Sequence, residues 1–340
     1  MKINIFKYFI ITVVAISIVC SCDINSLDTP TEETSSAIGF SNVSTKANKS
    51  DLEKDGFGVW ATISNATNPL YMNNVHVEYN TNTNSWEYNP LSYWISETVF
   101  NFVATYPYDE EGDEDGTFYT FDSNNSAVML TVSETPSEKD FLIATNTTDT
   151  SEESFDYTKE VNLYFQHMLT SVVLQIWRDG AKHQNDQMRI KQVTLSNVSK
   201  SGEYSTKTQN WTLNNDKVTV QKVYENLADT DDIGVAVNDG NNLTTTGVPA
   251  NPFGVMMLIP QDLNRNPVSL KIKYQLKRQN AADWEDAELE TYLPAVTWES
   301  NKRYTYNLVL SSVTDITIYY IQTKVDPWGT PQVGGTVIIK

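Results

Sequence analysis

Short stretches in which apolar and polar residues alternate recur along most of the chain, separated by clusters of Asn, Asp, Gly and Pro. In SLKIKYQL (269–276), for example, apolar residues occupy every second position and polar residues the others. This alternation predicts half-buried antiparallel strands, and no apolar pattern with helical spacing extends beyond about three turns. The chain is therefore expected to be all-β with short helices. Strands are expected at 37–43, 56–63, 101–108, 126–132, 140–145, 161–177, 190–198, 217–223, 253–261, 268–276, 303–313 and 316–325.

Length and charge indicate two domains. The chain has 340 residues, 40% of them hydrophobic, which is enough for two cores. Residues 23–157 carry 24 acidic and 4 basic side chains, a net charge of −20, whereas residues 158–340 carry 19 and 18, a net charge of −1. This step predicts two tandem β-sandwiches, at 37–157 and 158–340. The acidity argues against nucleic-acid binding, and it is also what keeps many exported proteins soluble.

The first residues have the pattern of an export signal. Lys2 and Lys7 precede an apolar run of twelve residues, 8–19, which is too short to span a bilayer as a helix. The motif VCSC resembles the lipobox of bacterial lipoproteins, and Ser21 suits the position before the cut. A lipoprotein signal peptide over 1–21, lipid attachment at Cys22 and a polar tether over 22–36 are therefore expected. Because no cysteine follows Cys22, disulfides and thiolate metal sites are excluded from the mature chain.

Signals for catalysis are absent from the sequence. The motifs of zinc peptidases, serine hydrolases and nucleotide-binding proteins do not occur, so we expect no enzyme activity, no metal and no cofactor. His76 and Glu78 alternate and could form a metal pair, but two ligands without a third favour a structural role. His167 lies in an apolar strand and is expected in a core or an interface, while His183 is expected in a polar loop.

Two further features leave alternatives open. The acidic run DEEGDEDG (109–116) could bind calcium, but its spacing differs from that of an EF-hand loop, and an acidic hairpin loop explains it as well. The aromatic residues Trp86, Tyr88, Tyr93 and Trp94 could line a sugar site, although burial in a core is the simpler interpretation.

Several short motifs together resemble the fimbrillin family, the lipoprotein-derived pilus subunits of Bacteroidales. The resemblance implies two transthyretin-like sandwiches and a precursor anchored by lipid in the outer membrane. It also implies a trypsin-like protease that removes the first strand, and assembly into an extracellular fimbrium by strand donation between identical or related subunits. The motifs are the lipobox ending at Cys22, AIGFSNVSTKA (37–47), DGFGVWATI (55–63), DFLIAT (140–145), LYFQHMLTSVVLQI (163–176), VMMLIPQDL (255–263), TWESNKRYTYNLVL (297–310) and VDPW (325–328).

Residues for this exchange can be assigned. In the first strand Ile38 and Phe40 alternate with small residues, and together with Val43 they are expected to form the displaced strand. Lys46 and Lys49 are the first basic residues after the signal, and they are the expected processing sites. In the family the cut follows arginine, whereas the first arginine here is Arg178. Either these lysines serve, or the strand stays and the protein is an anchor.

The tail has a matching alternation. Val333, Gly335, Val337 and Ile339 project to one side, which predicts a donor strand within residues 325–340. The alternative is that the tail pairs within its own domain. The predicted function is a structural pilus subunit, in the stalk, that supports adhesion. A β-sandwich surface lipoprotein that binds glycans is the alternative, and a secreted hydrolase is a third possibility.

Overall fold

The computed structural model describes residues 36–45, 49–110, 118–238, 243–311 and 316–324. Over these residues the protein is all-β, as the alternating pattern predicts. The helices are short: α1 (Lys49–Asp55), α2 (Gly180–His183) and the 3-10 turn η1 (Asp229–Asp231). In the described part of the chain, no helix is long and apolar enough to cross a membrane.

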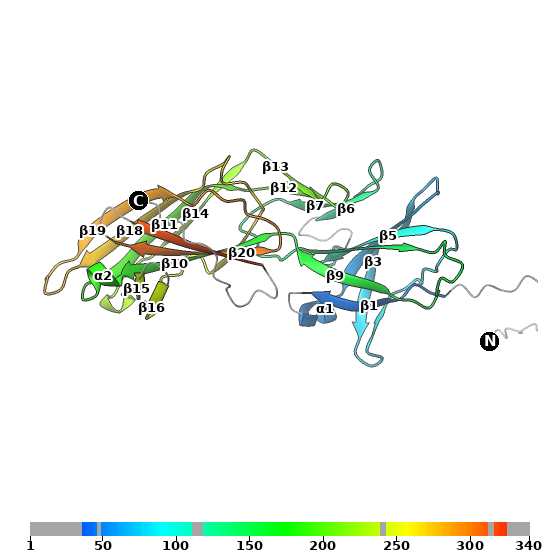
Figure 1. Cartoon of the computed structure of the whole chain (residues 1–340), viewed down its shortest axis with the longest axis horizontal. Helices are drawn as coiled ribbons and strands as arrows, with labels where there is room; N and C mark the ends of the chain where they lie inside the picture. The colour runs from blue at the N-terminus through cyan, green and yellow to red at the C-terminus, as the bar shows by residue number, and fades with distance from the viewer. Residues whose placement is uncertain (1–35, 46–48, 111–117, 239–242, 312–315, 325–340) are drawn as a thin grey trace, which may run out of the picture. The chain divides into compact units, whose positions relative to one another are not determined.

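The first sheet has seven strands in the order β1-β9-β8-β5-β2-β3-β4, so the first strand of the chain lies at an edge. Figure 1 shows β1 in blue beside β9 in green. The β1–β9 pair is parallel, whereas the other neighbours in this sheet are antiparallel. The strands are β1 (Phe40–Thr45), β2 (Phe57–Ile63), β3 (Leu70–Asn80), β4 (Ser85–Glu87), β5 (Val99–Tyr106), β8 (Leu142–Asp149) and β9 (Val161–His167).

An aromatic core lies on one face of this sheet. It is built by alternate residues of the strands, and Leu52 of α1 adds to it. The opposite face carries Trp60 and Ile143 into a second core, shared with a sheet in the order β13-β12-β7-β6. Its strands are β6 (Tyr119–Asp122), β7 (Ala127–Val132), β12 (Gly202–Ser205) and β13 (Asn210–Leu213).

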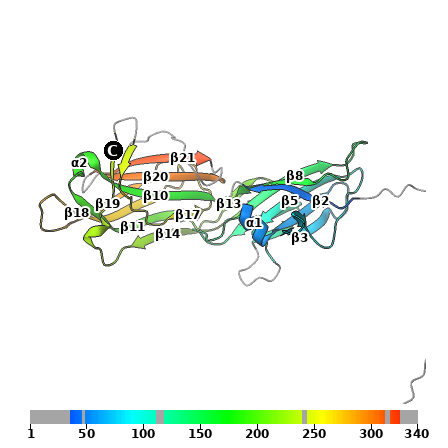
Figure 2. The ribbon, with the colours of Figure 1, turned by 90° about the horizontal axis from the view of Figure 1, so that it is seen from below.

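The remaining strands form a sandwich of two sheets around a third core. One sheet has the order β16-β15-β10-β20-β21, with β17 also paired to β10, and the other has the order β14-β11-β18-β19. Figure 2 shows β10, β20 and β21 side by side. The strands are β10 (Thr170–Asp179), β11 (Gln187–Ser199), β14 (Lys217–Val223), β15 (Val235–Asn238), β16 (Leu243–Thr246), β17 (Val255–Leu258), β18 (Ser269–Lys277), β19 (Glu285–Tyr292), β20 (Lys302–Leu310) and β21 (Ile316–Lys324).

Strand pairing crosses the sequence position at which the charge changes. β9 pairs with β8 and β1, and β12 pairs with β7, so residues 161–167 and 202–213 hydrogen bond into sheets of the first half. The domain limits 37–157 and 158–340 therefore remain a prediction from the sequence. Two of the sheets contain strands from both sides of residue 158.

Two expectations about local structure are corrected. The apolar run 161–177 forms two strands instead of one, because β9 and β10 join different sheets and the chain turns between them at Met168 and Leu169. His183 is buried instead of lying in a polar loop, with Nδ1 2.8 Å from Asp186 Oδ2 and Nε2 3.0 Å from the carbonyl oxygen of Ser311.

Candidate functional site: the seat of strand β1

The first described residues, 36–45, are here called the leading segment. Their alternation places Ile38 and Phe40 on the core face, where they are 1% and 3% exposed. Phe40 packs edge to face against Phe102, with ring centroids 6.2 Å apart. The three residues predicted to form the displaced strand all lie in one core, because Val43 is also buried, at 4% exposed.

A bulge explains how Val43 reaches the core. It lies three positions after Phe40, and odd spacing in a regular strand would turn it to the opposite face. The register shifts between Ser41 and Ser44: the chain advances three residues there while β9 advances two, from Asn162 to Tyr164. The extra residue of β1 restores the inward direction of Val43.

On one side the leading segment pairs with β9. Phe40 faces Val161 and Thr45 faces Phe165, in parallel register. The amide of Val161 donates to the carbonyl of Gly39 at 2.8 Å. Because β1 and β9 are far apart in sequence, no hairpin links them and the pair is held by non-covalent contacts alone.

On the other side, the start of the leading segment pairs with residues 92–94. The amide of Ile38 donates to the carbonyl of Ser92 at 2.9 Å, and the amide of Trp94 donates to the carbonyl of Ser36 at 3.3 Å. Ala37 and Tyr93 form an antiparallel bridge between them. Residues 161–165 and 92–94 together are called the seat. The second edge was missed from the sequence, because residues 92–94 belong to no predicted strand.

Helix α1 follows the leading segment but is attached to the rest of the domain by contacts of its own. Leu52 is fully buried in the core. Asp55 accepts a hydrogen bond from the Tyr106 hydroxyl at 3.2 Å, and its carbonyl oxygen lies 3.2 Å from Nε2 of His76. The helix ends at Asp55 and is followed by Gly56, which has a φ of 71° and donates a hydrogen bond from its amide to the carbonyl of Leu52, forming a left-handed cap. Leu52 shares its core with Ile38, Phe40 and Val43, but the two contacts of Asp55 do not involve the leading segment.

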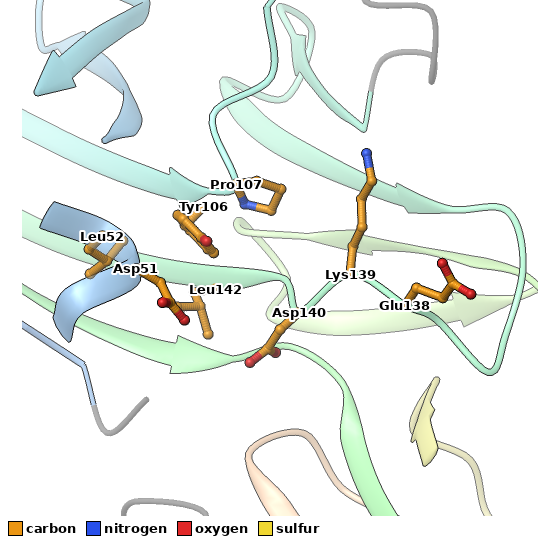
Figure 3. A pocket seen from close by; sticks show the side chains of 8 residues that line it. All are labelled: Asp51, Leu52, Tyr106, Pro107, Glu138, Lys139, Asp140 and Leu142. Atoms are coloured by element: carbon orange, nitrogen blue, oxygen red, sulfur yellow. The ribbon is translucent and has the colours of Figure 1, made fainter. Parts of the chain in front are cut away.

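An acidic recess of about 360 Å³ lies between α1 and the start of β8. In Figure 3 the ammonium of Lys139 points away from the Asp51 and Asp140 carboxylates. Burial, followed by the charges of Asp55, Asp51 and Asp140, raises the pKa of Tyr106 to about 12. The lining residues are Asp51, Leu52, Tyr106, Pro107, Glu138, Lys139, Asp140 and Leu142.

The structure describes only some of the predicted site residues. Lys49 is the first residue of α1. Cys22, Lys46 and the donor residues Val333, Val337 and Ile339 lie outside the described residues, so lipid attachment, cleavage and donation remain predictions.

The candidate metal ligands have structural contacts. His76 stacks on Tyr108, with centroids 3.9 Å apart and an interplanar angle of 7°. Asp109, at the start of the acidic run, is buried, and its Oδ2 accepts from the amides of Phe118 and Tyr119 at 2.5 and 2.8 Å. Within the described ranges, no group of three or more His, Cys, Asp or Glu side chains could hold a metal ion.

The other histidine and the aromatic residues mostly belong to cores. His167 is 1% exposed, and its Nδ1 lies 2.8 Å from Asp140 Oδ2, as expected for a core histidine. Trp94 is 3% exposed, while Trp86 and Tyr88 pack partly buried against the same core. Tyr93 differs, since it is 44% exposed.

The sequence model of the family described as Fimbrillin-like matches residues 45–328. The chain belongs to the Fimbrillin-like family. The match begins at the last residue of the leading segment and covers every later element that the structure describes. No curated protein matches the chain significantly.

Solved structures similar to this Fimbrillin-like chain come from Bacteroidales. A fimbrial protein from Bacteroides vulgatus has a TM-score of 0.60 and 16% identity, over 85% of this chain and 99% of that one. A candidate cell adhesion protein from Bacteroides uniformis has a TM-score of 0.47 and 15% identity, over 87% and 99%. A fimbrial assembly protein from Parabacteroides distasonis has a TM-score of 0.39 and 11% identity, over 85% and 93%. Only the first is similar enough to bear on the fold, which it shares.

Proposed function

We propose that this chain is a structural, non-enzymatic subunit of a cell-surface pilus, and that proteolysis lets a neighbouring subunit replace the leading segment with its own strand. Membership of the Fimbrillin-like family and the fold shared with the Bacteroides vulgatus fimbrial protein support the pilus role. The observation that carries the exchange is the seat, where Ile38, Phe40 and Val43 fill one core from an edge strand without a hairpin to its partner.

A seat without a strand has a higher free energy than a filled one, which favours binding of a new strand. Each of the three apolar side chains contributes about 1.5–3 kcal/mol by its burial. Removing the leading segment also leaves the backbone groups of β9 and of residues 92–94 unpaired, which is unfavourable where water does not reach them. A tail in which Val333, Val337 and Ile339 alternate supplies apolar side chains and a new ladder. Ordering that tail costs about 1–2 kcal/mol per residue, so durable fibres also need slow release.

Processing and anchoring complete the proposal. Cys22 carries the lipid that holds the precursor in the outer membrane, and a trypsin-like protease cuts after Lys46 or Lys49. Cleavage at Lys46 releases the leading segment ahead of α1, whereas Lys49 is part of that helix. The subunit then joins an extracellular fimbrium as a stalk component that supports adhesion.

Limited trypsin digestion of the mature chain carrying Cys22→Ser tests this function, followed by mass spectrometry and negative-stain electron microscopy. We expect cleavage after Lys46 or Lys49 and fibres only in digested samples. A chain lacking residues 333–340 should be cleaved in the same way but stay monomeric. A chain with Lys46→Ala and Lys49→Ala should keep its leading segment and also stay monomeric.

Fibres that form from uncleaved protein would contradict the proposal. So would undiminished assembly by the chain that lacks residues 333–340.

A further inference from the structure

Exposed hydrophobic side chains gather on the two segments that form the seat. Among the described residues, nine large hydrophobic side chains are exposed, and four of these lie in or directly beside the seat. Leu91, Tyr93 and Ile95 are 51%, 44% and 39% exposed, and Tyr164 of β9 is 61% exposed. Scattered exposed apolar residues need no explanation, but a cluster beside one strand indicates a contact surface.

Strand geometry places these side chains on the outward side. Leu91, Tyr93 and Ile95 alternate with Ser92 and with Trp94, which is buried in the core. On β9, Tyr164 alternates with Leu163, which is fully buried. Because successive side chains of extended chain point to opposite sides, the exposed ones face away from the core on both edges of the seat.

Leu91, Tyr93 and Ile95 are here called the rim. Contacts made by the backbone of Tyr93 and by the side chain of Trp94 hold this segment in place. The Tyr71 hydroxyl donates to the carbonyl of Tyr93 at 2.7 Å and accepts from its amide at 3.1 Å. Trp94 packs edge to face against Phe100, with centroids 5.1 Å apart. A surface held in place before binding loses little conformational entropy when a partner arrives.

The rim is also uncharged in a strongly acidic half of the chain. Residues 88–96 contain no charged side chain, although Glu87 and Glu97 flank them and residues 23–157 carry a net charge of −20. Apolar and aromatic residues without charge are typical of the centre of protein interfaces. Electrostatic repulsion between two copies of this acidic chain is smallest where the contact surface carries no charge.

Chain length determines how close a second copy must come. After Lys324, the last described residue, sixteen residues follow, and the leading segment that a donor strand replaces has ten. About six residues then remain between the donor strand and the end of β21, which reach at most about 20 Å at 3.3–3.6 Å per residue. The body of the donating subunit is therefore held beside the seat.

We propose that the rim, with Tyr164 on the opposite edge, is a docking surface for the body of a second copy of this chain, in addition to the strand that fills the seat. This inference rests on the proposed strand exchange. The rim then buries apolar surface against the donating subunit, and growth of the polymer depends on it while binding of an isolated strand does not.

The test separates strand binding from subunit docking. The rim variant of the mature chain, Leu91→Ser with Ile95→Ser, changes two side chains outside the seat and is compared with a matched variant, Val223→Ser with Val248→Ser. Each variant removes two aliphatic side chains from exposed positions. After trypsin digestion, light scattering measures polymer growth. Fluorescence anisotropy measures binding of a labelled peptide of residues 325–340 to digested chains that also lack residues 333–340, so that no neighbour's tail occupies the seat. A single variant, Tyr164→Ser, probes the opposite edge without altering the rim.

We expect the rim variant to bind the peptide within about twofold of wild type and to polymerise at least about tenfold more slowly, which corresponds to 1.4 kcal/mol. The matched variant should grow like wild type, and Tyr164→Ser, a change within the seat, should slow growth by more than any loss of peptide binding accounts for. Growth of the rim variant at the wild-type rate would overturn the docking surface alone. Failure of the processed wild type to bind the peptide would overturn the strand exchange and this inference with it. Loss of carbohydrate binding in the rim variant, with unchanged growth, would assign the rim to a glycan instead.

Discussion

Phe40 and Phe57 lie on opposite sides of the predicted cut and pack edge to face, with ring centroids 6.3 Å apart and an interplanar angle of 84°. Both are buried in the same core, Phe40 at 3% and Phe57 at 0% exposed. Only Phe57 belongs to the part of the chain that would remain after the proposed cleavage. Substitutions at these two positions therefore distinguish effects on the stability of the intact precursor from effects on the stability of the processed subunit.

The first prediction uses this pair. Phe40→Ala should lower the free energy of unfolding of the intact chain by about 3–5 kcal/mol, because it leaves a cavity in the core. The same change should not affect the stability of the processed polymer, since Phe40 leaves with the strand. Phe57→Ala should destabilise both forms. Thermal unfolding before and after trypsin measures the four cases, and equal losses for Phe40→Ala in both forms would count against strand replacement.

The second prediction concerns the bulge in β1. Deleting Asn42 removes the extra residue between Ser41 and Ser44, so that Val43 follows Phe40 at the even spacing that a regular strand needs to face the core. A regular ladder against β9 should gain about 1 kcal/mol, the contribution of one recovered hydrogen bond. Amide hydrogen exchange of β9 should become slower in the uncleaved variant.

Growth of the polymer from that variant should begin later after proteolysis, because the better-paired strand leaves more slowly. Substitution of Asn42 by Ser keeps the chain length and serves as the control. Faster exchange of β9 amides after the deletion would show that the bulge stabilises the pair, contrary to this expectation.

The third prediction concerns pH and the acidic recess. Burial and the charges of Asp55, Asp51 and Asp140 raise the pKa of Tyr106 from 10.0 to about 12. The folded chain thus holds the phenol proton more tightly than the unfolded chain does. The stability contributed by the protonated contact is complete below pH 10 and is lost as pH rises toward 12.

Tyr106→Phe removes both the hydrogen bond to Asp55 and this dependence. At neutral pH the wild type should unfold at a higher temperature than the variant, and the difference should shrink above about pH 10. Unfolding temperatures across this range, with spectroscopic titration of the tyrosinate as a second measurement, provide the check. A constant difference up to pH 12 would show that Tyr106 is not the group that titrates.

The local sequence pattern was sufficient for most of the fold, for the leading segment and for the β9 edge of the seat. The alternation around Ile38 and Phe40 correctly placed both side chains in a core, since the period of a strand depends only on neighbouring residues. The parallel pairing of β1 with β9 and the pairing of β12 with β7 join residues far apart in sequence. Nothing in a local pattern specifies such partners.

The edge formed by residues 92–94 was missed for a related reason. The stretch follows Pro90 and is too short and irregular to be recognised as a strand. The sequence carries no signal that Trp94 is buried beside an exposed Tyr93, because Tyr93, Trp94 and Ile95 are consecutive apolar or aromatic residues without period-two alternation. The run 161–177 was predicted as one strand because the apolar residues Met168 and Leu169 stand where the chain bends between β9 and β10, so no polar turn signal marks the break.

One edge of the seat pairs in parallel and the other antiparallel, and this difference has a consequence for the architecture of a fibre. A strand in the seat runs alongside β9 in the same sense and opposite to residues 92–94, so a strand inserted backwards would meet two ladders of the wrong type. Insertion in a single orientation means that every subunit repeats the placement of the one before it. A filament built by the proposed strand exchange would therefore have polarity, with two chemically different ends, of which only one would grow by accepting tails.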